Sequence, residues 1–201
     1  MFPHLIVDVE ASALSEGYPI ELAIADIENG CVHAWLIRPH ALWAWDVWSA
    51  ESEKIHGLSR AVVDSGEDVH VVAQALVRVA GDRRLASDNP EFDREWLRKL
   101  FEAAGEEDLP VRFAREFLGA ELRDLGRRHK RSAEDIDALN RARNSAVDHS
   151  AAGDAAAWAA AIELAGAAEK IDLARIDAML GKWIARAQAA TPWRAATKVG
   201  G

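Results

Sequence analysis

The sequence predicts an α/β domain in which a mixed β-sheet is flanked by helices, and two observations carry this prediction. Three β-like runs follow one another near the N-terminus, at residues 5–14, 20–30 and 31–39. Beyond them, stretches with helical spacing alternate with single short β-like runs. This order is typical of a layered domain whose sheet has both antiparallel and parallel neighbours.

The three N-terminal runs are expected to be antiparallel neighbours. The first reads LIVDVEASAL, and its apolar, β-branched residues are those of a strand covered on both faces. Asn29 and Gly30 separate the second run from the third, and this dipeptide is a strong signal for a β-hairpin. Residues 41–60 are expected to be irregular, with short helical turns such as SAESEKIHGLS.

Helices and short strands follow in turn. The segment VHVVAQALVRVAG has helical spacing and ends at Gly81, and RRLASDN returns to a strand. The clearest helix is NPEFDREWLRKLFEAAG, with Asn89 as the N-cap and Pro90 at the first helical position. Its predicted buried stripe consists of Phe92, Trp96, Leu97 and Leu100.

The C-terminal half is expected to be mainly helical. A short strand around LPVRFAREF precedes polar helices that continue to residue 145. The segment HSAAGDAAAWAAAIELAGAA is then predicted as a helix and residues 169–190 as the last one, whereas the tail from Thr191 is expected to be loose.

Composition and charge narrow the classes of function. With 201 residues, half of them hydrophobic and 28% charged, the chain is expected to be globular with a sizeable core. Cys31 is the single cysteine, which fits a reducing compartment, and neither a signal segment nor a membrane span is visible, so the expected location is cytoplasmic. The formal net charge of −9 argues against a protein that coats nucleic acid, but not against one that grips a short end.

Positive charge is nevertheless concentrated in one part of the chain. This run fits a solvated helix face at least as well as it fits a set of phosphate contacts. Its members are Arg123, Arg127, Arg128, Lys130, Arg131, Arg141 and Arg143.

Two acids interrupt the first predicted strand. Asp8 and Glu10 point to the same side, about 7 Å apart, because side chains alternate along a strand. At that spacing two carboxylates repel by roughly 2 kcal/mol with an effective dielectric constant near 20. Protonation, a basic partner or a bound cation could offset this repulsion. Alternatively, the strand end is frayed and both acids lie in water.

Three further residues occupy positions that fit either a functional site or an ordinary helix start. Asp93 falls in the first turn of a predicted helix, where the helix dipole alone would favour an acid. His149 and Asp154 flank the start of another helix, and they could equally be a surface histidine and an ordinary first-turn acid with Ser150 as the cap.

Taken together, the blocks DVE, NPEFD and HSAAGD resemble the three signature blocks of DEDDh 3′–5′ exonucleases, the family of polymerase proofreading subunits and oligoribonucleases. The phrase KIHGLS at residues 54–59 adds a fourth match, and the resemblance covers roughly residues 4–165. There are two departures. Ala13 stands where glycine is common in the family, and Asp88 stands where histidine is frequent.

The resemblance implies a ribonuclease H-like fold, with an exonuclease domain over residues 1–165 and a C-terminal helical extension with a loose tail over 166–201. It also implies hydrolysis of single-stranded DNA or RNA from the 3′ end with two divalent cations, Mg²⁺ or Mn²⁺, for which hard oxygen ligands are suited. The implied metal ligands are Asp8, Glu10, Asp93 and Asp154. Asp8 would bridge both ions, and His149 would be the general base. The residues expected to hold the 3′-terminal nucleotide are Ser12, Leu14, His56 and Asn89.

Other functions stay open at this point. The blocks do not separate DNA from RNA, so an RNA-trimming or oligoribonuclease-type activity is the alternative enzyme, and an inactive nucleic-acid-binding adaptor of the same fold is the non-enzymatic one. Trp43, Trp45 and Trp48 could stack on bases, but packing in a core or a dimer contact is the favoured interpretation.

Overall fold

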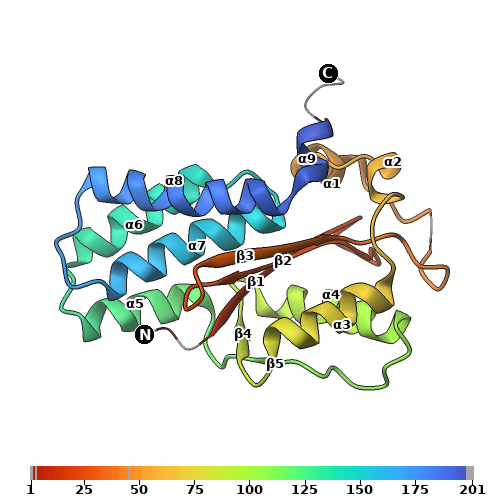
Figure 1. The fold of residues 1–201 in the computed structure, drawn as a ribbon, viewed down its shortest axis with the longest axis horizontal. Helices are drawn as coiled ribbons and strands as arrows, with labels where there is room; N and C mark the ends of the chain where they lie inside the picture. Colours follow the sequence, from red (N-terminus) through yellow and green to blue (C-terminus); the bar gives the residue numbers. More distant parts are fainter. Residues whose placement is uncertain (1, 3, 45, 198–201) are drawn as a thin grey trace.

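The protein has a mixed β-sheet with helices on both faces, as the sequence predicts (Figure 1). The computed structural model describes residues 2, 4–44 and 46–197. Within them the sheet has five strands in the order β3-β2-β1-β4-β5. Strands β1 (Leu5–Ala11), β2 (Pro19–Asp26) and β3 (Cys31–Leu36) are antiparallel neighbours, whereas β4 (Arg84–Ala86) and β5 (Arg112–Phe113) continue the sheet in parallel.

The hairpin between β2 and β3 sets the register of this half of the sheet. Asn29 donates its backbone N–H and its side-chain amide to the carboxylate of Asp26, which closes the turn. On the other side of β2, the pairing with β1 places Glu10 directly opposite Glu21 and shifts register just after Glu10. Two acids thus face each other across the two central antiparallel strands.

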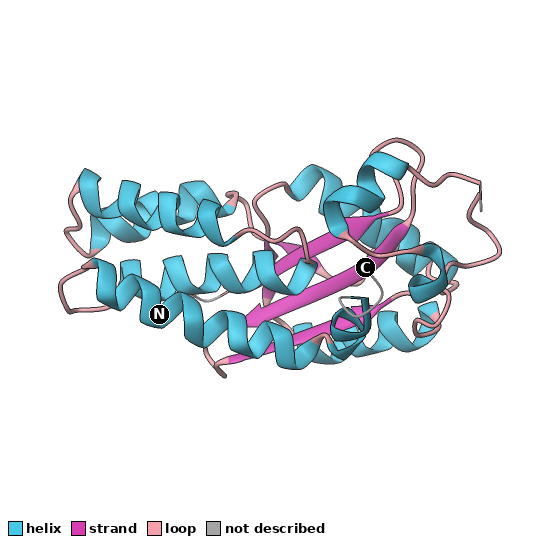
Figure 2. Cartoon of the chain, turned by 90° about the horizontal axis from the view of Figure 1, so that it is seen from above, coloured by secondary structure: helices cyan, strands magenta, loops and turns pink. Residues whose placement is uncertain are grey.

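Two layers of helices cover the sheet. On one face, α3 (Val69–Ala80) and α4 (Pro90–Ala103) pack against a core that includes Leu5 and Val7 of β1. The other face carries Ile6 and is covered by helices from the C-terminal half, which pack against one another (Figures 1 and 2). These are α5 (Leu118–Arg128), α6 (Ala133–Ala146), α7 (Ala151–Gly166) and α8 (Leu173–Ala190). Shorter helices are α1 (Ala50–His56), α2 (Arg60–Val63) and α9 (Pro192–Thr197).

Helix α7 lies directly on the sheet because its side chains are small. All its alanines are buried, and it contacts both β1 and β2. Asp8 and Glu10 share the parity of Ile6 on β1, so they point to this same face. The N-terminal end of α7 therefore lies beside the acids of β1.

The structure corrects three details of the sequence prediction. Phe92 is 44% exposed and does not belong to the buried stripe of α4, which includes Trp96, Leu97 and Leu100. Asn89 is the N-cap residue of α4 as predicted, but its side chain makes no capping hydrogen bond. The tail from Thr191 is not loose as far as it is described, because it forms α9, whose Trp193 and Arg194 bond to a buried glutamate.

The boundary predicted after residue 165 falls in the last turn of α7 and stays a prediction. None of the described helices is long and apolar enough to cross a membrane.

Candidate metal centre

Five carboxylates from four segments of the chain gather at one edge of the sheet. Asp8 and Glu10 come from β1, and Asp88 follows β4, so two neighbouring parallel strands deliver acids at their carboxyl ends. Asp93 lies in the first turn of α4 and Asp154 in the first turn of α7. The four predicted metal ligands are thus brought together, with Asp88 added to them.

The carboxylates form two groups of three that share Asp8. One group is Asp8, Asp88 and Asp93, and the other is Asp8, Glu10 and Asp154. In each group, one potential ligand atom from every residue lies within 4.8 Å of those of the other two. Asp88 was not predicted as a ligand, although its position at the carboxyl end of a parallel strand, where ligands of α/β sheets commonly bind, was a signal.

Burial and mutual repulsion raise the pKa values of these acids. The pKa of Asp8 lies well above its usual range, first because the group is desolvated and then because Asp93 and Glu10 are close. Burial, with the neighbouring carboxylate of Glu21, raises the pKa of Glu10 to about 8, although the positive charge of Arg194 opposes this shift. The described residues around Asp8 therefore leave negative charge uncompensated, which is what a divalent cation would offset.

Burial likewise raises the pKa of the two helix-borne acids, to about 7 for Asp93 and about 6 for Asp154. Asp93 is only 4% exposed and accepts hydrogen bonds from the hydroxyl of Ser87 and the N–H of Val9. Interaction with the helix dipole alone favours an acid at this position but does not require its side chain to be buried. Asp154 is half-buried, and its Oδ1 has no hydrogen-bond partner among the described residues. Hard oxygen donors and this unpaired buried oxygen fit Mg²⁺ or Mn²⁺.

His149 lies immediately before Ser150, the N-cap of α7, and it is exposed. Its backbone has a φ of +54°, a left-handed conformation that non-glycine residues adopt rarely and that often marks functional sites. Its charge influences Asp154, but His149 belongs to neither group of three acids. This placement suits a group that would act beside ions held by these acids without binding them.

The turn that presents His149 is fixed by hydrogen bonds. Oδ1 of Asp148 accepts from the N–H of Ser150 at 3.1 Å and from its hydroxyl at 2.6 Å. The hydroxyl of Ser150 in turn accepts from the N–H of Gly153 at 3.0 Å. A Cβ at Gly153 would lie 2.2 Å from Oδ1 of Asp148 and 2.7 Å from Oγ of Ser150, so these side chains would have to move to admit one.

A hollow of about 420 Å³ opens beside Glu10. Leu14 and His56, two of the predicted nucleotide-binding residues, line it together with Trp96. Leu14 is 76% exposed and therefore free to contact a ligand. His56 is buried; its Nδ1 accepts from the N–H of Leu58 at 3.1 Å, while Nε2 has no hydrogen-bond partner in the described part of the chain.

The other two residues expected to bind the nucleotide lie differently. Ser12 is fully buried, and its hydroxyl accepts a hydrogen bond from the N–H of Tyr18 at 3.0 Å. Asn89 is exposed, directly follows Asp88, and is not one of the described residues that line the hollow. Their roles toward a nucleotide stay predictions.

The tryptophan cluster is engaged in packing where it is described. Trp43 stacks on Tyr18 with ring centroids 5.3 Å apart, and Trp48 donates its indole N–H to Glu53. Trp45 lies outside the described residues.

Three members of the basic run, Arg127, Arg128 and Arg131, make contacts away from the acids. Arg127 and Arg128 pair with Asp124 on α5, and Arg131 donates to carbonyl groups at the C-terminal end of α7. Arg143 is different, because its guanidinium lies 3.9 Å from the ring centre of Trp158 and its charge acts on Asp88 and Asp154. One member of the run is thus close enough to the acids to affect them.

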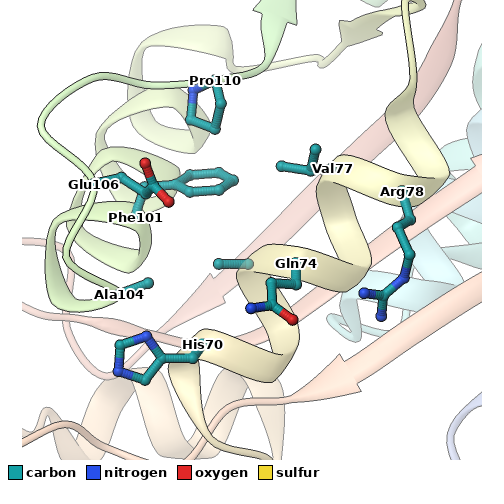
Figure 3. A pocket seen from close by; sticks show the side chains of 9 residues that line it. His70, Gln74, Val77, Arg78, Phe101, Ala104, Glu106 and Pro110 are labelled. Atoms are coloured by element: carbon teal, nitrogen blue, oxygen red, sulfur yellow. The ribbon is translucent and has the colours of Figure 1, made fainter.

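A second hollow, of about 370 Å³, lies between α3 and α4, on the face of the sheet opposite to α7 (Figure 3). Val77 and Phe101 face it from the two helices, and Glu106 is the one carboxylate in its described lining. Neither group of acids reaches this hollow, so the chemistry of the described chain is concentrated at the edge where β1, β4 and α7 meet.

No protein-family model matches the sequence, and no curated protein matches it significantly. The chemistry of the site is therefore inferred from its own residues. It offers five carboxylates for hard cations, an exposed histidine beside them and a hollow next to Glu10.

Proposed function

We propose that this protein is a metal-dependent 3′–5′ exonuclease of the DEDDh type, which hydrolyses phosphodiester bonds at the 3′ end of single-stranded nucleic acid. The observation that carries the proposal is the pair of three-acid groups that share Asp8. The sheet order β3-β2-β1-β4-β5, with three antiparallel strands followed by two parallel ones, is compatible with a ribonuclease H-like fold.

In this proposal the acids hold two divalent cations. Asp8 belongs to both groups and would contribute to both sites, Glu10 and Asp154 would complete one site, and Asp93 with Asp88 would complete the other. Bound cations of this kind supply positive charge that promotes ionisation of a water molecule and neutralises the departing oxygen. Pairs of cations in such sites lie about 3.5–4 Å apart, and two three-carboxylate groups that share one member suit this separation.

The chain's own groups supply the remaining chemistry. His149, exposed beside Asp154, accepts the proton of the attacking water. The hollow lined by Glu10, Leu14 and His56 receives the terminal nucleotide, so that the last phosphodiester lies at the acids. In this proposal one nucleotide is removed at a time from a free 3′ end.

A gel assay on matched DNA and RNA oligomers labelled at the 5′ end tests this function. With Mg²⁺ or Mn²⁺ the labelled strand should shorten stepwise from the 3′ end, mononucleotides should be released, and EDTA should stop the reaction. The relative rates on DNA and RNA decide between the two enzymatic interpretations. Cleavage of a circular single strand would show an endonuclease instead, and binding without any cleavage would show an adaptor.

A further inference from the structure

We infer that the C-terminal helix α9 is part of this site, with Arg194 and Trp193 as positioning residues that hold both the N-terminal turn of α7 and the wall of the nucleotide hollow. The inference deepens the proposed function and rests on it for the effect on turnover. Its structural half, the coupling of α9 to α7 and α1, can be measured without any nuclease assay.

Glu21 on β2 connects α9 with the start of α7. Its side chain is fully buried, and it lies directly opposite Glu10 on β1. Oε2 of Glu21 accepts the N–H of Ala151 at 2.9 Å, and Ala151 is the first residue of α7. Glu21 therefore fixes the start of the helix that carries Asp154 and follows His149.

Helix α9 compensates the charge of Glu21. Nε and Nη2 of Arg194 donate to the two carboxylate oxygens at 2.7 and 2.5 Å, a two-point contact between guanidinium and carboxylate. The indole N–H of Trp193 donates to Oε1 at 2.8 Å. A buried carboxylate is tolerated only with such partners, so the position of Glu21 depends on two side chains from the end of the chain.

Arg194 also reaches the wall of the hollow. Its Nη1 donates to the carbonyl oxygen of His56 at 2.8 Å, at the last residue of α1. The side chain of His56 lines the hollow beside Glu10, with Ile55 and Ser52 of the same helix. One guanidinium thus contacts both the carboxylate that fixes the start of α7 and the helix that lines the hollow.

The test compares substitutions at Arg194 with one at Arg175, which makes a similar set of contacts away from the acids. Arg175 pairs with Glu169 and donates to the carbonyl oxygen of Lys170, so Arg175→Ala removes an ion pair and a carbonyl contact at the protein surface. Arg194→Ala and Arg194→Lys are made in the full chain, and Trp193→Phe removes a single donor to Glu21 as a milder change.

Three quantities are measured for each variant: turnover at saturating oligonucleotide, affinity for Mn²⁺, and hydrogen exchange at Ala151 and over residues 52–58. Loss of a group that orients metal ligands typically costs about 10–100-fold in activity or metal affinity, and that loss is expected for Arg194→Ala. Exchange should accelerate at Ala151 and in 52–58 but not in α3. Arg194→Lys should recover part of the loss, Trp193→Phe should show a smaller one, and Arg175→Ala should leave all three quantities unchanged.

Each outcome decides the inference. Faster exchange in Arg194→Ala without a change in turnover and Mn²⁺ affinity would reduce α9 to a structural element, and unchanged exchange would refute the coupling itself. If Arg194→Ala does not fold, Trp193→Phe is judged by the same criteria. A wild-type protein that neither binds Mn²⁺ nor cleaves would refute the proposed function, and exchange at Ala151 and residues 52–58 would then decide the coupling alone.

Discussion

At the scale of single residues, three carboxylates on one face of the sheet differ in whether basic or polar side chains compensate their charge. Glu21 is compensated within the chain by Arg194 and Trp193. Asp8 and Glu10, on the neighbouring strand, face other carboxylates, and burial and repulsion raise the pKa of both. The pair of Asp8 and Glu10 does not stabilise the fold, because each uncompensated acid lowers stability when it ionises. This cost indicates a functional role for the pair.

The first prediction concerns Asp8→Asn. Nuclease activity should be abolished, because the residue common to both groups of acids is lost. In metal-free buffer at about pH 8 the variant should be more stable than wild type by on the order of 2 kcal/mol, the size of one carboxylate repulsion at this spacing. Urea unfolding in EDTA measures the difference, and near-wild-type cleavage by the variant would contradict the assignment of Asp8.

The second prediction concerns His149→Ala. Removal of a positioned base typically lowers a rate by about 10²–10⁴-fold, so single-turnover cleavage should fall by that order. Because His149 is exposed and lies outside both acid groups, Mn²⁺ affinity and stability should hardly change.

His149 is a ligand instead of a base if its substitution weakens Mn²⁺ binding strongly. An unchanged cleavage rate would make it an ordinary surface residue.

At the scale of elements, the first turn of α7 is where local sequence and site geometry meet. The hydrogen bonds among Asp148, Ser150 and Gly153 fix the turn that presents His149. The turn leaves no space for a side chain at Gly153, where an added Cβ would clash with both Asp148 and Ser150. Backbone rigidity at this point is therefore expected to matter for turnover more than for the rest of the fold.

The third prediction follows from that close contact. Gly153→Ala should displace Asp148 and lower both cleavage and stability, the latter by roughly 1–3 kcal/mol, as is usual for overpacking. Gly181→Ala is the matched control, because an added Cβ there meets nothing within 4 Å in the middle of α8. This control should raise the free energy of unfolding by about 0.5–1 kcal/mol and leave cleavage unchanged.

Comparable losses in the two glycine variants would show that the turn has no special role. Thermal unfolding and cleavage rates, measured side by side, distinguish these cases.

The elements that sequence predicts well are those whose signals are local. The Asn29 hairpin, the helix that ends before Gly81 and the cap at Ser150 each depend on neighbours within a few positions, and all three are present in the structure. Helix α9 was missed because what orders it is a buried glutamate more than 170 positions away, as the Glu21–Arg194 contact shows. Long-range compensation of this kind has no local pattern.

The same distinction applies within the site. The four predicted ligands could be named because their blocks have a recognisable order, and the structure brings their carboxylates together. Asp88 was noted only as a departure from the family pattern, because its closeness to Asp8 depends on the parallel pairing of β1 with β4. Exposure of Phe92 likewise depends on how α4 is oriented against the sheet, which helical spacing alone does not determine.

At the scale of the whole molecule, the raised pKa values link stability to pH. In the unfolded chain these carboxyl groups ionise near 3.8–4.5, whereas in the fold their pKa rises to about 6 for Asp154, 7 for Asp93 and 8 for Glu10. Over that interval the folded state holds protons that the unfolded state has already released. The contribution of these groups to stability is therefore present at low pH and is lost as pH rises through their folded pKa values.

The fourth prediction is that the metal-free protein becomes less stable between about pH 5 and pH 8, and that Mg²⁺ or Mn²⁺ restores more stability at the higher pH. Binding should release protons, because the ligands must be ionised. Unfolding measured in EDTA and in excess metal at both pH values gives the comparison. Stability that rises with pH in EDTA would contradict the assignment of buried, uncompensated acids.

The central claim is that Asp8 joins two cation sites, and Mn²⁺ binding tests it most directly. Titration of the full chain with Mn²⁺ in the presence of a 5′-mononucleotide, followed by calorimetry and electron paramagnetic resonance, should reveal two ions per chain that are magnetically coupled. Asp8→Asn should abolish the coupled pair, while Arg175→Ala should bind as wild type does. Absence of Mn²⁺ binding by the wild type, or a coupled pair that survives Asp8→Asn, would contradict the account.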